Sequence, residues 1–420
     1  MIVFAREPVF DSTQQLFAYQ LVFRDGDEGS LPASLFAQDT VKPHDLDEGF
    51  KDGVSAGSLV GLDELLKGNV SIISVRKDDL IHGLPNEFLP QDTIIEISDI
   101  NDDETALISA IQNLREKGFR FVIHNKTPLS EICLSLADYL KININNISLL
   151  ELKLLQSEIA EKSIKTIATR VESHTLFQKC IEAGFDYFQG FFFLSRPKHS
   201  QQELPANKLS MLELIALTSQ KELDTDKVRA IFEKDPTLSY LLLRFINNPL
   251  INKSHKISSI KHALSYLGEV MLRKFIAIVS VAHLNQNNVQ ELLHVSLVRA
   301  KFCELLDDEI FDSNDAMSAF MVGLLSLIDV ILQRDMRELL NQISLSNAIK
   351  RALIERKGQY ALILACVRAL ESSSWMSLKA ISNKLGVTET QVQAHLHDSI
   401  LWANSIHQVD SPVFPRAKTE

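Results

Sequence analysis

The sequence predicts an α/β barrel followed by an all-α domain, and three observations lead to this fold class. Up to about residue 197, short apolar runs alternate with amphipathic stretches of helical period. A polar segment with two prolines, SRPKHSQQELPAN at 195–207, interrupts the pattern, and only helical patterns follow it. We therefore predict a barrel domain over 1–197, a linker over 198–207 and a helical domain over 208–406. A chain of 420 residues is long enough for two such cores.

The first domain opens with a predicted hairpin, Ile2–Arg24, whose turn is the polar segment Asp11–Gln15. Helical patterns such as Asp103–Lys117 and Ser173–Ala183 separate the strand candidates that follow. A repeated strand-then-helix order predicts a mainly parallel sheet, and the number of strands favours a closed, TIM-like barrel over an open sheet. The strand candidates are Ser71–Val75, Thr93–Ile97, Phe119–His124, Tyr139–Asn143, Ile164–Ala168 and Phe185–Gln189.

The second domain shows apolar residues at helical spacing and no alternating runs. The tail, 407–420, has two prolines and no period, and we predict that it is disordered. The predicted helices are Lys208–Gln220, Asp224–Lys234, Pro236–Asn247, Ser259–Leu284, Val289–Leu306, Asp315–Arg334, Asp335–Ile343, Ser346–Arg356 and Tyr360–Ser372, with further helix to about Ile406.

Composition limits the classes of partner. The formal net charge of −11 disfavours binding to nucleic acid and to anionic membranes. The four cysteines are far apart and form no C-x-x-C pair, so neither a zinc knuckle nor a redox motif is present, and free thiols are typical of a reducing cytosol. The N-terminus lacks the apolar core of a signal peptide, and the longest apolar run, Ala319–Leu332, is too short to span a bilayer. We predict a cytoplasmic protein with no membrane association.

Segments in both domains resemble known families. The first domain opens with AREPVFDSTQQLFAYQLVFR and ends with AGFDYFQGFFFLSRP, which resemble the two ends of EAL domains. The second domain resembles the HDOD domain, a helical relative of HD-type phosphohydrolases that lacks their metal ligands. The chain thus resembles the EAL-HDOD two-domain proteins of bacterial signalling. The HDOD-like segments are DPTL at 235–238, LLRFINNP at 242–249, ISSIKHALSYLG at 257–268 and GLLSLID at 323–329.

The resemblance implies a degenerate active site. EAL domains hydrolyse cyclic di-GMP with divalent metal ions held by acidic residues and an asparagine, because Mg²⁺ and Mn²⁺ prefer oxygen ligands and activate water. By the resemblance, six of the matching positions have lost the expected residue and four have kept it. The changed positions are Gln20, Ser74, His124, Asn125, Asn143 and Thr169. The retained positions are Glu96, Lys141, Glu172 and Gln189, of which Glu172 is the structural support rather than a metal ligand.

One remaining acidic ligand does not offset the dehydration of Mg²⁺, so we expect no hydrolysis, no bound metal and no cofactor. An alternative site for zinc or manganese would combine Glu96, His124 and Asn125, whereas a structural reading makes His124 a strand-end residue.

Nucleotide binding without hydrolysis is a separate question. Arg24 and Gln189 are the candidate ligand contacts; the alternative is that Arg24 pairs with Asp25 or Asp27 and that Gln189 supports the barrel rim.

The helical domain offers two further motifs. The only adjacent His-Asp pair, His397-Asp398, lies away from the GLLSLID helix, so we assign no metal site there. The segment Leu378–Leu396 has the spacing and central glycine of a helix-turn-helix. Its second helix contains no Lys or Arg and only Gln391 and Gln393 as base-reading candidates, so a plain helical hairpin is the preferred interpretation.

These observations predict a non-catalytic signalling protein in the cyclic di-GMP sphere that acts by protein–protein interaction, with a barrel that could still respond to nucleotide. The first alternative is a residual cyclic di-GMP phosphodiesterase. The second is a DNA-associated regulator. The partners expected are other signalling proteins, which the sequence does not identify, and homodimer formation is left open.

Overall fold

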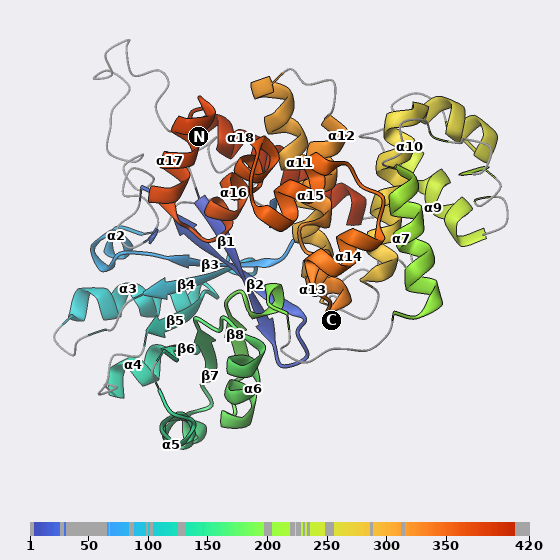
Figure 1. Ribbon diagram of the computed structural model, residues 1–420. Helices are drawn as coiled ribbons and strands as arrows, with labels where there is room; N and C mark the ends of the chain where they lie inside the picture. The colour runs from blue at the N-terminus through green and yellow to red at the C-terminus, as the bar shows by residue number, and fades with distance from the viewer. Residues whose placement is uncertain are drawn as a thin grey trace, which may run out of the picture. The chain divides into compact units, whose positions relative to one another are not determined.

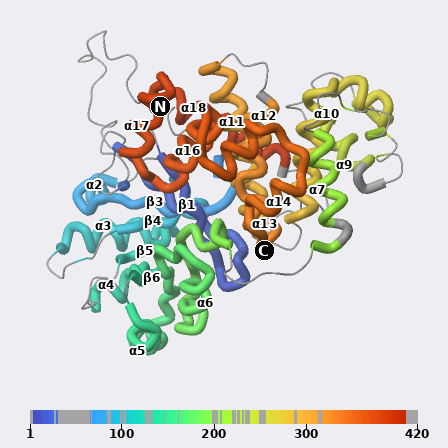
Figure 2. Tube along the Cα trace, in the orientation of Figure 1, coloured from blue at the N-terminus to red at the C-terminus, as the bar shows by residue number. Residues whose placement is uncertain are grey.

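The structure is a computed structural model, and its described residues form two compact units (Figures 1 and 2). One unit is Met1–Ser195 with Leu370–Trp375, and the other is Arg196–Ala369 with Met376–Glu420. The described residues are 4–25, 29–30, 65–66, 68–83, 88–97, 100, 104–124, 131–145, 147–196, 204–218, 223, 228–229, 232, 236–247, 256–285, 289–311 and 316–407.

The first unit is a closed eight-stranded barrel in which sequential strands are neighbours. β1 is antiparallel to both of its neighbours, β2 and β8, and every other pair is parallel. The predicted barrel is therefore confirmed, and the predicted strands agree with the observed ones to within about two residues at each end. The strands are β1 (Phe4–Asp11), β2 (Leu16–Phe23), β3 (Val70–Ser74), β4 (Thr93–Ile97), β5 (Arg120–His124), β6 (Tyr139–Asn143), β7 (Lys165–Thr169) and β8 (Tyr187–Gln189).

An apolar layer fills the inside of the barrel. It contains one residue from each of seven strands, and partly buried Phe17, Val70 and Tyr187 pack against it. Side chains alternate between the two faces of a strand, so the next inward position on each strand lies two residues further along. The layer consists of Val9, Ala18, Ile72, Ile94, Val122, Tyr139 and Ile167.

Helices on the outside of the strands connect them (Figure 1). Side-chain caps written in the sequence account for the starts of α5 and α6. Ser148 and Glu151 form a capping box at the start of α5, and the Ser173 hydroxyl accepts the Leu176 amide at the start of α6. Gly184 ends α6 in the left-handed conformation. The helices are α2 (Lys77–Ile81), α3 (Thr105–Glu116), α4 (Glu131–Leu136), α5 (Leu149–Ile159), η6 (Ala160–Lys162), α6 (His174–Ala183) and η7 (Phe192–Leu194).

The second unit is helical, which confirms the predicted class. Its most extensive packing is between α11 and α12, where a Cβ on Gly323 would lie 2.3 Å from the carbonyl oxygen of Arg299. This glycine is therefore required by the close approach of the two helices. The elements are α7 (Ala206–Thr218), α9 (Pro236–Ile246), α10 (Ile260–Leu284), α11 (Gln290–Phe311), α12 (Ala316–Leu325), α13 (Ile328–Leu332), α14 (Met336–Gln342), α15 (Asn347–Lys350), the π-helix η8 (Arg351–Glu355), α16 (Gln359–Glu371), α17 (Trp375–Leu385) and α18 (Glu389–His407).

Several predicted boundaries differ from the structure. The predicted helix 315–334 is two helices, with a break at 326–327, and the predicted helix 346–356 changes from α to π geometry at Arg351. Gly268 interrupts α10 with φ 67° and ψ 173°. α7 begins inside the predicted linker, at Ala206. Linker residues 198–203, most of the predicted helix 224–234 and the tail from 408 lie outside the described residues.

Among the described residues, no helix combines the length and the apolar character needed to cross a membrane.

Candidate functional site

A polar layer lies directly above the apolar layer, at the carboxyl ends of the parallel strands. Each of its members stands two residues from a residue of the apolar layer or, for Gln189, from Tyr187, which packs against that layer. Alternation along the strands therefore points all of them into the barrel mouth. The sequence placed six of them at strand ends, and Gln20 was singled out only through the resemblance. Glu7, on β1, was missed. The polar layer is Glu7, Gln20, Ser74, Glu96, His124, Lys141, Thr169 and Gln189.

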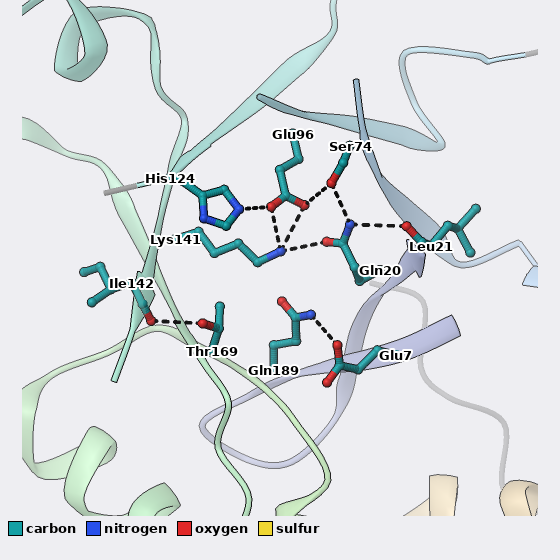
Figure 3. Close-up of polar contacts among 10 residues, drawn as sticks. All are labelled: Glu7, Gln20, Leu21, Ser74, Glu96, His124, Lys141, Ile142, Thr169 and Gln189. Carbon is teal, nitrogen blue, oxygen red and sulfur yellow. Dashed lines mark hydrogen bonds and ion pairs between the residues drawn. The ribbon is translucent and has the colours of Figure 1, made fainter. Parts of the chain in front are cut away.

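Glu96 is the centre of a hydrogen-bonded cluster (Figure 3). Lys141 Nζ donates to both carboxylate oxygens at 2.9 Å, and Ser74 Oγ donates to Oε2 at 2.9 Å. His124 Nε2 contacts Oε1, and because a carboxylate only accepts, this ring nitrogen carries the proton. The four contacts match the approximately four lone-pair positions of a carboxylate. Glu96 is therefore saturated by donors from its own chain.

Gln20 extends the cluster on the side of β2. Its side-chain oxygen accepts from Lys141 Nζ at 2.9 Å, while its nitrogen lies 3.4 Å from Ser74 Oγ. Gln20, Glu96 and Lys141 are all nearly completely buried, whereas the His124 side chain is 46% exposed. The lysine charge thus lies between one carboxylate and one neutral amide, where the resemblance would put a second carboxylate.

The charges in the cluster set the ionisation of Glu96. Burial alone would raise its pKa, but the nearby Lys141 charge and the His124 hydrogen bond outweigh burial and hold the pKa well below its usual range. Glu96 and Lys141 therefore form an ionised, mutually neutralised pair inside the barrel.

Glu7 and Gln189 form a separate pair across β1 and β8 (Figure 3). Gln189 Nε2 donates to Glu7 Oε2 at 2.6 Å, and the buried Gln189 Oε1 has no hydrogen-bond partner in the described part of the chain. Burial raises the pKa of Glu7, with partial offset from Gln189 and Lys141. Glu7 was missed by sequence reasoning. The available signal was a glutamate in AREPVFD at the position where the family's ARQPIFD stretch has glutamine.

The other predicted site residues do not join the cluster. Thr169 Oγ1 donates to the Ile142 carbonyl at 3.4 Å, and the Asn143 side chain accepts the Asn145 amide at 3.0 Å. Glu172 is exposed beyond β7, and Arg24 lies 3.9 Å from Asp25 in an ion pair. Asn125 lies outside the described residues. Ligand contacts by Arg24 and Gln189 stay predictions.

The described donor set does not fit the divalent metals that the resemblance implies. A hard cation needs several oxygen ligands with free lone pairs, and the Glu96 oxygens already accept from Lys141, His124 and Ser74. Across the described ranges, no group of three or more His, Cys, Asp and Glu side chains is arranged to hold a metal ion.

The helix-turn-helix candidate is a packed part of the helical unit. Gln391 is occupied locally: its oxygen accepts from the amide and hydroxyl of Thr388, and its nitrogen donates to Glu309. Gln393 is 3% exposed. Neither glutamine is therefore presented for base contacts. His395 Nε2 also contacts Glu309, and His397 lies 3.4 Å from Asp398 in an exposed pair.

Comparison with known proteins matches the HDOD domain family over residues 204–359. Two relatives span nearly the whole chain. The uncharacterised protein YuxH of Bacillus subtilis (strain 168) is 28% identical over 396 residues, covering 92% of this chain and 94% of its own. The cyclic di-GMP phosphodiesterase CdgJ of Vibrio cholerae (serotype O1, El Tor Inaba N16961) is 27% identical over 409 residues, covering 96% of this chain and 93% of its own.

Solved structures also match the chain. A standalone EAL protein of Vibrio cholerae O395, in its cyclic di-GMP-bound form, is 16% identical with a TM-score of 0.33, covering 46% of this chain and 91% of that one. An EAL-domain protein of Listeria monocytogenes EGD-e is 16% identical with a TM-score of 0.32, covering 46% and 87%.

The fold and the family match define a two-domain protein with a closed β/α barrel followed by a helical HDOD domain. The family match agrees with the HDOD assignment that the sequence resemblance gives to the second domain.

Proposed function

We propose that the protein is a non-catalytic regulator in cyclic di-GMP signalling that acts by binding other proteins. The observation that carries the proposal is the saturation of Glu96 by Lys141, His124 and Ser74. Metal-assisted hydrolysis needs an ion that activates water, and this cluster replaces the ion's ligand contacts with internal hydrogen bonds. The barrel core is nevertheless intact, so the fold can present surfaces without performing chemistry.

The link to cyclic di-GMP comes from the EAL-HDOD organisation and from CdgJ, which is named for its activity on this nucleotide. The activity itself is not transferred to this chain, because Gln20 and Thr169 stand where the resemblance expects glutamates that hold metal. The expected partners are other signalling proteins, and a nucleotide-responsive barrel would control their binding.

The first experiment is a calorimetric titration of cyclic di-GMP into the full chain, with Mg²⁺ and again with EDTA, followed by analysis of the recovered nucleotide. Recovery of intact cyclic nucleotide in both conditions is expected. Binding that persists in EDTA makes the barrel a receptor, and absence of binding leaves a protein-interaction scaffold. Accumulation of a linear dinucleotide only in Mg²⁺ contradicts the proposal.

The role in protein binding requires its own test. Affinity capture from the native cell extract should recover specific proteins at levels that respond to cyclic di-GMP or that exceed those on an unrelated bait. Capture that never exceeds the background overturns this part of the proposal, even if the nucleotide result is as expected.

A residual phosphodiesterase is the alternative function, favoured by the name of CdgJ and by the closeness of Glu96 and Lys141. It predicts slow turnover in excess Mn²⁺ that disappears in Glu96→Ala. The DNA-associated alternative predicts salt-sensitive retention in a gel shift, and the local contacts of Gln391 argue against it.

A further inference from the structure

A short basic turn follows α15 in the helical unit. It consists of Lys350, Arg351, Arg356 and Lys357, and we refer to it as the basic turn. Arg351 begins the π-helix η8, and Arg356 is the residue that ends it. Segments of π geometry in proteins occur frequently at functional sites.

The backbone gathers these cations onto one turn. The amides of Arg356 and Lys357 both point to the carbonyl of Arg351, the second at 3.4 Å. The chain therefore folds back so that residues five and six positions after Arg351 lie beside it. Arg351, Arg356 and Lys357 are exposed, and Lys350 is half-buried.

No described acidic side chain forms an ion pair with the basic turn, and Glu355 within it offsets only one of its four positive charges. None of its four cations forms an ion pair or a side-chain hydrogen bond with a described residue, and the same is true of the exposed Glu355 within it. Gathering like charges without counter-charges costs free energy in the isolated protein. The favourable interaction of basic side chains with the end of a helix accounts for cations in the last turn, but not for Arg356, which lies past it.

Arg356 also occupies a conformation that favours glycine. Its φ is 57° and its ψ is 40°, the left-handed region that usually holds glycine at the end of a helix. A side chain with a Cβ is strained there by about 1 kcal/mol. The fold therefore keeps an arginine at a position where glycine would be easier to accommodate.

The size and charge of the basic turn indicate the partner. Its four cations and Glu355 sum to +3, which leaves −14 for the rest of a chain whose net charge is −11. A long polyanion carries many more charges than the turn can neutralise and is repelled by the net negative charge of the chain, whereas the charges of a short acidic segment stay within a screening length of about 8–10 Å of the turn. Arginine also pairs with carboxylates through two parallel hydrogen bonds.

We propose that the basic turn is a docking surface for a short acidic segment, rich in Asp and Glu, of a partner protein. The inference deepens the proposed protein-binding role, but it names one surface and does not depend on the state of the barrel.

The test is fluorescence anisotropy of a labelled oligoglutamate peptide titrated with the full chain, at low and at physiological salt. The variant is Arg351→Ala/Arg356→Gly/Lys357→Ala. The matched control is Lys153→Ala/Lys379→Ala/Lys384→Ala, which removes the same three charges from exposed positions elsewhere. We expect the first variant to bind about tenfold more weakly and the control to change less than about twofold.

The single change Arg356→Gly separates binding from folding. It relieves the left-handed strain, so the melting temperature should be unchanged or higher while peptide affinity falls. Equal weakening in the control triple variant, or unchanged binding in the basic-turn variant, overturns the proposal. Tighter binding of duplex DNA or anionic vesicles than of the peptide, lost in the same variant, also overturns it. If the basic-turn variant loses peptide binding but still captures partner proteins as the parent does, the basic turn is not the docking surface, and the proposed function stands. If the parent chain itself captures no partner protein, the proposed function fails, whatever the peptide result.

Discussion

Lys141 Nζ lies 2.9 Å from both carboxylate oxygens of Glu96, and both side chains are about 95% buried. The two residues come from β6 and β4, with His124 of β5 between them in the sheet order. Removing two charges from water is costly, and their mutual attraction with additional hydrogen bonds offsets that cost. The barrel mouth therefore contains a fixed internal cation.

Lys141→Met should destabilise the barrel by about 3–5 kcal/mol, because it leaves the Glu96 carboxylate buried without its main counter-charge. Urea denaturation measures the free energy of unfolding. The matched control is Lys165→Met, which breaks a 2.6 Å pair with Asp186 whose lysine is 58% exposed. A surface pair contributes at most about 1 kcal/mol, so the control should cost much less. The double variant Lys141→Met/Glu96→Gln should recover part of the lost free energy of unfolding, because no buried charge is left unpaired. Equal losses in Lys141→Met and Lys165→Met would contradict the conclusion that the buried pair is the stronger one.

Glu7→Gln should stabilise the protein at neutral pH and have little effect in acid. Burial raises the pKa of Glu7 above its ordinary value of 4.5, so the folded state holds that proton more tightly than the unfolded state does. Below about pH 4 the Glu7 carboxyl is protonated in both the folded and the unfolded state, so it does not affect the free energy of unfolding. As the pH rises from the pKa of Glu7 in the unfolded state through its pKa in the folded state, the parent protein loses stability. Urea midpoints measured across this range test the sign. A variant less stable than the parent at neutral pH would be the contrary result.

Glu96→Gln should show the opposite pattern. The pKa of Glu96 is held below its usual range by Lys141 and His124 against the effect of burial, so its contribution to stability is complete above the unfolded pKa and is lost only as pH falls through the folded one. The variant should be less stable than the parent from about pH 5 upward, with the difference shrinking in strong acid. A difference that grows as the pH falls would show that the carboxylate is not the stabilised form.

The strands could be predicted because each carries its own signal. Thr93–Ile97 and Tyr139–Asn143 are short apolar runs between helical patterns, and the structure reproduces both to the residue. The breaks within the helices could not be predicted from the sequence. Gly268 and the step at 326–327 lie inside continuous apolar periods, where a glycine or serine is usually tolerated and only tertiary packing decides.

Six members of the polar layer were predicted for the same reason that the strands were, since strand ends fix where inward side chains appear; Gln20 came from the resemblance, and Glu7 was not predicted. The pairing within it was not predictable. Glu7 and Gln189 are 182 residues apart, and nothing local to either indicates the other. The resemblance predicts which residue types have changed, but the contact of Lys141 with Gln20 and Glu96 depends on side-chain geometry across three strands, β6, β2 and β4.

Gly323→Ala should destabilise the helical unit by about 1–3 kcal/mol or more, because the added Cβ would lie 2.3 Å from the backbone oxygen of Arg299. Backbone atoms on α11 cannot move aside as a flexible side chain can. Gly68→Ala is the comparison: its φ is 70° but no atom lies within 4 Å of the added Cβ, so only backbone strain of about 1 kcal/mol is expected. Thermal unfolding of both variants measures the difference, and equal losses would contradict the close helix contact.

Mn²⁺ should not raise the melting temperature of the parent protein, because the Glu96 oxygens are already saturated by Lys141, His124 and Ser74. A variant with the residue types that the resemblance expects should gain a metal site. Binding at a hundredfold excess over Kd would add about 2.7 kcal/mol of stability. The substitutions are Gln20→Glu, Ser74→Asn, His124→Asp, Asn125→Asp, Asn143→Asp and Thr169→Glu.

The control for this experiment is the same variant with Glu96→Ala, which removes the one retained acidic ligand and should abolish the Mn²⁺-dependent shift. Stabilisation of the parent by Mn²⁺ that is lost in Glu96→Ala would mean that the metal displaces Lys141 from the carboxylate, and the saturated cluster would then be a closed state of a working site. If neither protein responds, the substituted side chains do not create a metal site, which contradicts the prediction for the substituted variant.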